Sequence, residues 1–262
     1  MPYHTLRLEP EGDLATLTFS RPEKRNALSL EMIEELMAAL AEAERSAARV
    51  VILTGAGKAF CSGMDLEALK AMATESPSAE AARESSRTMA RMFRRIYEFP
   101  KPLIAAVNGA AIAGGCGIAT LCDFTLAAPE AKFGYTEVRI GFIPAIVSVF
   151  LIRQVGEKRA RDLLLTGRIF GAEEARELGL VNEVVPQEKL MSRARELAAQ
   201  LIENSPNSLA RTKRLLRERS AQELDRELDL AIEANARIRS TADFREGLAA
   251  FLEKRKPVWS GE

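Results

Sequence analysis

Two turns rich in small residues are places where backbone N–H groups could meet a ligand. They span residues 59–66 and 108–117, and each follows a run that predicts a buried strand. Small side chains let another group approach the backbone closely. An apolar stretch follows Gly114 and Gly115, so these glycines are predicted to open a helix. The first N–H groups of a helix are unpaired and partly positive, and two such donors converging on one point would stabilise an oxyanion.

The same residues also fit a purely structural role. Glycines allow close backbone packing, and taken alone the two turns favour that explanation over catalysis. Glu137 presents a similar choice. A carboxyl group in an apolar pocket has a raised pKa and can transfer a proton, but glutamate is rarely buried. On residue type alone, Glu137 is predicted to be a surface carboxylate.

The elements that must hold these residues alternate between strand and helix. Short apolar runs predict strands at 14–19, 50–54, 102–107 and 124–127. Ser29 is the expected N-cap of an intervening helix. One face of that helix is predicted to carry Ile33, Leu36, Leu40, Ala43 and Ala47. Buried strands separated by helices indicate parallel βα units, and hence an α/β fold.

The second part of the chain is predicted to be helical. Strand signals nearly vanish after about Glu157. Helices are expected at 157–166, 172–179, 188–203, 207–218, 221–236 and 241–256. The Ala-, Ser- and Glu-rich segment 73–84 predicts a mobile loop or a weak helix.

Composition excludes several classes of function. The 262 residues carry 37 basic and 37 acidic side chains, so no global basic field attracts nucleic acid. No apolar run is long enough to span a membrane. The three cysteines do not form a disulfide framework and no signal peptide precedes them, so a cytoplasmic location is expected. His4 is the only histidine, which argues against a zinc site or a Ser-His-Asp triad.

Several longer segments resemble one known family. They are R-P-E-K-R-N-A-L-S (21–29), F-C-S-G-M-D-L (60–66), K-P-L-I-A-A-V-N-G-A-A-I-A-G-G-C-G (101–117), C-D-F (122–124), F-G-Y-T-E-V-R-I-G-F-I-P (133–144) and G-L-V-N-E-V-V-P (179–186). In this order and spacing the chain is similar to the crotonase (enoyl-CoA hydratase/isomerase) family from about residue 5 to residue 256.

The resemblance implies a fold, a substrate and a mechanism. Residues 1–200 would form a crotonase-like spiral of ββα turns with the CoA and active site, and residues 201–262 a helical region that builds a trimer or a dimer of trimers. The substrate would be an acyl-CoA thioester, with no other cofactor and no metal. The motifs place the oxyanion donors on the N–H groups of Met64 and Gly114 and the catalytic acid/base on Glu137.

The resemblance also places the CoA along the turn near 24–27 and the loop 59–66. The corresponding positions are Lys24, Arg25, Ala27, Ala59, Ser62, Gly63, Asp65 and Leu66. Lys256 is a candidate for a phosphate contact, although basic residues near a helix end also complement its dipole. Tyr135 and Phe142 are expected to border the acyl chain.

One departure from the family pattern limits the assignment. Typical hydratases of the family have a second glutamate where this chain has Gly117. The favoured activity is still hydration of a 2-enoyl-CoA, including a branched glutaconyl-type substrate. The alternatives are an enoyl-CoA isomerase that uses one glutamate and a non-catalytic crotonase-like binding protein. The apolar segment 141–148 indicates either a dry acyl pocket or a helix core.

Overall fold

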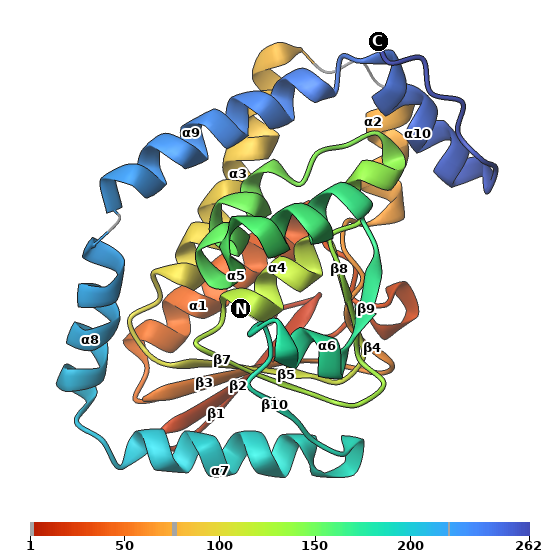
Figure 1. The fold of residues 1–262 in the computed structure, drawn as a ribbon. Helices are drawn as coiled ribbons and strands as arrows, with labels where there is room; N and C mark the ends of the chain where they lie inside the picture. Colours follow the sequence, from red (N-terminus) through yellow and green to blue (C-terminus); the bar gives the residue numbers. More distant parts are fainter. Residues whose placement is uncertain (1–2, 75–77, 220) are drawn as a thin grey trace.

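The computed structural model describes residues 3–74, 78–219 and 221–262 (Figure 1). The strands are β1 (Leu6–Glu11), β2 (Leu14–Phe19), β3 (Val50–Gly55), β4 (Ala59–Cys61), β5 (Leu103–Val107), β6 (Ala110–Ile112), β7 (Phe124–Ala127), β8 (Lys132–Gly134), β9 (Ile169–Gly171) and β10 (Glu183–Val184). The α-helices are α1 (Leu30–Arg45), α2 (Leu66–Thr74), α3 (Ala79–Tyr97), α4 (Gly114–Leu121), α5 (Ala145–Thr166), α6 (Ala172–Glu177), α7 (Leu190–Ile202), α8 (Pro206–Glu218), α9 (Ala221–Ile238) and α10 (Ala242–Glu253). Short 3₁₀ helices are η1 (Pro22–Lys24), η2 (Glu137–Ile140) and η3 (Gln187–Lys189).

Two sheets organise the first part of the chain. The larger has the order β1-β2-β3-β5-β7-β10 and is parallel except for the β1–β2 pair. The smaller has the order β4-β6-β8-β9, with only β8 and β9 antiparallel. All four strands expected from apolar runs are present, and the α/β fold class is confirmed.

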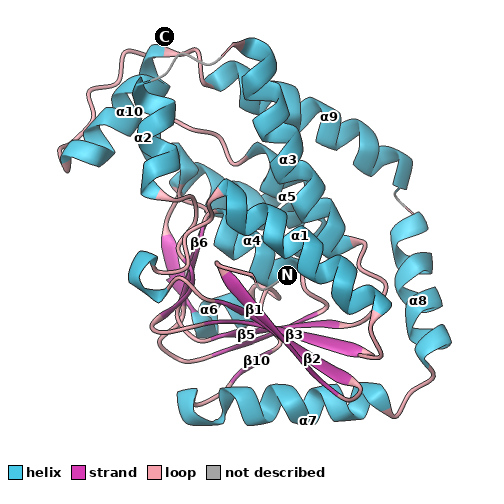
Figure 2. Ribbon diagram, turned by 180° about the vertical axis from the view of Figure 1, so that it is seen from behind, coloured by secondary structure: helices cyan, strands magenta, loops and turns pink. Residues whose placement is uncertain are grey.

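The larger sheet is buried on both faces, as parallel sheets generally are. Alternate residues of its strands point to opposite sides. One set, including Val50, Ile52 and Ile104, packs against α7. The intervening residues, including Val51 and Leu53, join the larger core with α1, α3, α4 and α5. Figure 2 shows α7 alone on one side of this sheet and the main group of helices on the other.

Several boundaries differ from expectation. The helix predicted to extend to Ala47 ends at Arg45, because the extended backbone of Ser46 stops it, and Ala47 is exposed. Ser29 does cap this helix and accepts a hydrogen bond from the Met32 N–H. The expectation of almost no strands after Glu157 was wrong for β9 and β10, which have three and two residues. Runs this short carry no readable alternation.

Two helical segments were expected only in part. The segment predicted at 157–166 is the second half of α5, which Gly156, with φ 76° and ψ 161°, divides into two pieces. The segment 73–84 contains the end of α2 and the start of α3, and Ser78 caps α3. Its central residues, 75–77, lie outside the described residues.

The C-terminal helices extend over the rest of the molecule. Helix α9 packs against α3 and α5, whereas α10 packs against α2 and η2 (Figure 1). The helical C-terminal region is therefore present, while its boundary at residue 200 and its role in a trimer stay predictions. Within the described ranges, no helix is both long and apolar enough to cross a membrane.

Candidate active site

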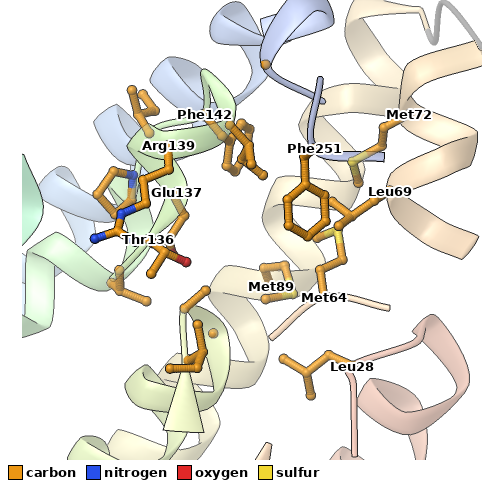
Figure 3. Close-up of a pocket in the computed structure, with 18 of the residues that line it drawn as sticks. Leu28, Met64, Leu69, Met72, Met89, Thr136, Glu137, Arg139, Phe142 and Phe251 are labelled. Atoms are coloured by element: carbon orange, nitrogen blue, oxygen red, sulfur yellow. The ribbon is translucent and has the colours of Figure 1, made fainter. Parts of the chain in front are cut away.

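A cavity of about 660 Å³ lies between the small sheet and the helices α2, α3, α5, α9 and α10. Most of its lining is apolar, including Leu28, Met64, Leu69, Met72, Met89, Phe142 and Phe251 (Figure 3). A few polar groups interrupt this surface. Concave, mainly apolar cavities with a few polar groups are typical of small-molecule sites.

Glu137 carries the one carboxyl group among the described residues that line this cavity. It opens η2, directly after β8, and Figure 3 shows its side chain on the wall opposite Met64 and Met89. Its Oε2 atom is buried and has no hydrogen-bond partner among the described residues. Burial raises the pKa of Glu137 to about 7, although a hydrogen bond from its own backbone N–H acts in the opposite direction. The expectation of a surface carboxylate, based on residue type alone, is therefore wrong.

Helix α10 packs closely against the end of η2, the short helix that Glu137 opens. Gly141 ends η2 with φ 67°, and a Cβ atom there would clash with the backbone of Asp243. A Cβ atom on Gly247 would likewise lie 2.6 Å from the carbonyl oxygen of Ile140. Two glycines thus let the backbones of η2 and α10 touch. This close approach places a C-terminal helix over the segment that carries the carboxylate.

Met64 offers a backbone N–H on the opposite wall. Leu28 and Met64 form a parallel bridge in which Leu28 donates to the Gly63 carbonyl and accepts from the Asp65 N–H. In a parallel bridge, one residue uses both its N–H and its C=O to bond the neighbours of the facing residue. The N–H and C=O of the facing residue, here Met64, then point to the opposite side. The N–H of Met64 therefore points away from Leu28, and Met64 lines the cavity.

Gly114 offers a second N–H. It is the first residue of α4, where a helix has no earlier carbonyl to accept its hydrogen bond. The preceding residue, Ala113, has φ 49° and ψ −119°, a conformation that favours glycine and costs an alanine about 1–3 kcal/mol. The Ala113 N–H donates to Gly134 at 2.7 Å, which holds the strained residue on β8. The conformation of Ala113, held by this hydrogen bond, sets the direction in which the Gly114 N–H points.

Other glycines of the two turns serve close packing. A Cβ atom on Gly115 would clash with the carbonyl of Cys61, and one on Gly109 with that of Lys58. Gly63, at φ 92°, would bring a Cβ atom to 3.1 Å from the Ile112 oxygen. The close-packing interpretation of the glycine turns is therefore confirmed for these residues, while the oxyanion role of Met64 and Gly114 stays a prediction. The packing glycines hold the turns together, so that Met64 and Gly114 line one cavity.

Gly117 stands in a position that has no room for a side chain. A Cβ atom there would lie 2.7 Å from Cε1 of Phe93 and 2.9 Å from Cγ1 of Val147. Both neighbours are buried. The space next to Gly117 is thus filled by apolar atoms from α3 and α5. A second carboxylate cannot be accommodated there without repacking.

The other predicted contacts fall into three groups. Arg25, Ser62 and Phe142 line the cavity. Outside the lining, the buried positions are Ala27, Ala59, Gly63 and Asp65, and the exposed positions are Lys24, Leu66 and Lys256. Asp65 pairs with Arg21 at 2.8 Å and accepts the Glu67 N–H at 2.9 Å; these bonds lower its pKa, although its burial opposes them.

Tyr135 does not border the cavity. Its side chain is 1% exposed, and its hydroxyl lies 3.2 Å from that of Thr120. The expectation that it borders the acyl chain is corrected, because the ring is enclosed in the core below α4. The segment 141–148 fulfils both of its interpretations, since residues 142–147 line the cavity and α5 begins at Ala145.

Several lining residues were missed from the sequence. Met89 and Phe93 come from α3, Asn235 and Arg239 from α9 and its end, and Phe251 from α10. Each lies in an amphipathic helix whose pattern resembles that of any packed helix. Their role depends on contacts between segments far apart in the chain.

Comparison with known proteins agrees with this geometry. The sequence model of the enoyl-CoA hydratase/isomerase family matches residues 9–262. A Thermus thermophilus protein is 48% identical over 248 residues, covering 94% of this chain and 97% of that protein. The short-chain-enoyl-CoA hydratase of Clostridium acetobutylicum is 37% identical over 259 residues, covering 98% and 97%.

A solved structure resembles the whole fold. The crystal structure of an enoyl-CoA hydratase/isomerase from Xanthobacter autotrophicus Py2 has a TM-score of 0.87 and 34% identity. The match covers 97% of each chain. The present chain belongs to the enoyl-CoA hydratase/isomerase, or crotonase, family.

Proposed function

We propose that this protein is an enoyl-CoA hydratase, which adds water across the 2,3 double bond of a 2-enoyl-CoA thioester. The observation that carries the proposal is the buried Oε2 atom of Glu137, which has no hydrogen-bond partner among the described residues and belongs to an apolar cavity that Met64 and Gly114 also line. A carboxyl group with a pKa of about 7 exchanges protons readily near neutral pH.

The proposed reaction uses one carboxylate twice. The N–H groups of Met64 and Gly114 hold the thioester oxygen, and Glu137 takes a proton from a water molecule. The water oxygen bonds to C3, and the π electrons move to the thioester oxygen as an enolate. Glu137 then returns the proton to C2, so that one water is added in total. Each oxyanion donor typically lowers such a barrier by roughly 3–4 kcal/mol.

A second candidate is an enoyl-CoA isomerase. The specific observation in its favour is the apolar packing around Gly117, which leaves Glu137 without a second carboxylate to orient water. In that reaction Glu137 removes a proton from C2 of a 3-enoyl-CoA and delivers it to C4. The same enolate oxygen would rest on the same two donors. A binding protein without catalysis is the third candidate.

Two substrates separate these candidates. Crotonyl-CoA should lose the absorbance of its conjugated thioester when incubated with the purified protein, because hydration removes the double bond. For an isomerase, 3-hexenoyl-CoA should instead gain that absorbance while crotonyl-CoA stays unchanged. If neither substrate changes, catalysis on simple enoyl thioesters is refuted and the binding function is favoured.

The pKa of Glu137 predicts a distinct pH profile. Glu137 must be ionised to accept a proton, so kcat/KM should rise with pH, with an apparent pKa of about 7, and then level off. Initial rates between pH 5 and 9 in buffers of constant ionic strength measure it. A flat profile over this range would show that Glu137 is not the base.

A further inference from the structure

Arg239 is a half-buried cation without a counter-ion among the described residues, and its Nε atom is fully buried. It follows the last turn of α9 and lines the same cavity as Glu137. Its guanidinium group lies 5.7 Å from the centre of the Phe142 ring, and one terminal nitrogen donates to Ser85 at 3.4 Å. Across the part of the chain that the structure describes, its Nε atom has no hydrogen-bond partner and no carboxylate forms an ion pair with it.

Asn235 adds a second unsatisfied group on the same face of α9. It lies one turn before Arg239, and residues four apart on a helix are neighbours. Asn235 is 6% exposed, and its Oδ1 atom is also without a hydrogen-bond partner among the described residues. Burying a polar group or a charge without a partner is costly, so two such groups in one cavity wall indicate a missing ligand group.

The two groups belong to a different wall from the CoA candidates. Arg239 and Asn235 come from α9, which packs against α3 and α5. Arg25 belongs to the turn 24–27 and Ser62 to the turn 59–66, and the Ser62 N–H donates to the Arg25 carbonyl. Glu137 belongs to a third segment of the lining, η2.

We propose that this cavity binds acyl-CoA thioesters whose acyl chain ends in a carboxylate. Arg239 would pair with the carboxylate, and the Asn235 amide, turned so that its NH₂ group faces the cavity, would donate a second hydrogen bond. The orientation of an amide is assigned from its surroundings, so this turn costs no repacking. The thioester would remain at Met64 and Gly114. The inference that such thioesters are substrates rests on the proposed function. The inference that the cavity binds them preferentially does not.

Phosphate groups of the CoA moiety have the same chemistry as a carboxylate, and the test must separate the two. Saturated thioesters with acyl chains of five carbons do so. Glutaryl-CoA ends in a carboxylate and pentanoyl-CoA in a methyl group, while their CoA moieties are identical. Neither has a double bond to hydrate, so their dissociation constants can be measured by calorimetry whether or not the protein is a hydratase.

The wild-type protein should bind glutaryl-CoA roughly 10- to 100-fold more tightly than pentanoyl-CoA, the ordinary range for a charged hydrogen-bonded pair. Arg239→Gln should abolish that preference and leave pentanoyl-CoA affinity unchanged. Arg239→Lys, which keeps the charge, should retain part of it. Arg237→Gln is the matched control, because Arg237 is exposed on the same helix.

Three binding results would overturn the proposal. The first is equal wild-type affinity for both thioesters, and the second is an Arg239→Gln protein that keeps the preference. The third is equal weakening of both thioesters by Arg239→Gln, because the guanidinium group would then serve the CoA or the fold. Turnover of glutaconyl-CoA against 2-pentenoyl-CoA is measured separately. Failure to hydrate either would refute the hydratase function, whereas the binding results would still decide the anion site.

Discussion

Glu137→Gln should lower kcat for crotonyl-CoA hydration by about 1,000-fold, within the usual range for loss of a general acid/base. Glutamine has nearly the same shape but cannot accept and return a proton. Because the lost step occurs after binding, KM should change much less than kcat. Steady-state kinetics with crotonyl-CoA, in parallel for both proteins, give the two constants.

A matched control distinguishes lost chemistry from lost structure. Glu130 is exposed and lies outside the cavity, so Glu130→Gln should behave like the wild type. Glu137→Gln should also be at least as stable as the wild type above pH 7. Burial raises the pKa of Glu137, so the folded protein favours the protonated side chain. The stability that this protonated side chain contributes is complete below the pKa of Glu137 in the unfolded chain and is lost as pH rises through about 7. A Glu137→Gln protein with more than a tenth of wild-type kcat would rule out the proposed role.

Gly117→Glu should destabilise the protein by about 3 kcal/mol or more and should not speed hydration. Its Cβ atom alone would contact Phe93 at 2.7 Å and Val147 at 2.9 Å, and overpacking of this kind typically costs about 1–3 kcal/mol. The carboxyl group would then enter an apolar region without a partner, which adds to the loss. Urea unfolding monitored by circular dichroism measures the free energy change.

Two further variants test the cause of that loss. Gly117→Ala adds only the Cβ atom and should cost less than Gly117→Glu. Combining Gly117→Glu with Phe93→Ala removes the nearest obstruction. The double variant should therefore lose less unfolding free energy than the sum of the losses in the two single variants. A Gly117→Glu protein with wild-type stability and faster hydration would show that the space around Gly117 adapts readily.

The parts of the fold that local sequence determines were predicted well. Strands such as β3 and β5 are continuous apolar runs, and the Ser29 side chain marks the start of α1. The edge strand β1, the short strand β10 and the whole smaller sheet of β4, β6, β8 and β9 were missed. The strands of the smaller sheet have three residues each and pair only with segments brought near by the fold. Local pattern cannot show a partner that is distant in sequence.

The candidate site was also predicted only in part. Motif resemblance identified Met64, Gly114 and Glu137, which all line one cavity, but residue type alone placed Glu137 at the surface. Its enclosure depends on a cavity built from segments far apart in the chain, and these contacts arise only in the folded chain. Arg239 was missed because an arginine near a helix end is ordinary in sequence. Its buried Nε atom without a hydrogen-bond partner, which only the folded structure shows, distinguishes it from the other arginines that line the cavity.

The covering of η2 by α10 has a consequence for biosynthesis. Ribosomes add residues from the N-terminus, so Glu137, Met64 and Gly114 are made well before residues 242–253, which pack against η2. A growing chain that lacks α10 therefore leaves the end of η2, at Ile140 and Gly141, without the backbone that contacts it in the complete fold. Domains fold as units during synthesis, so the contact between η2 and α10 is among the last to form.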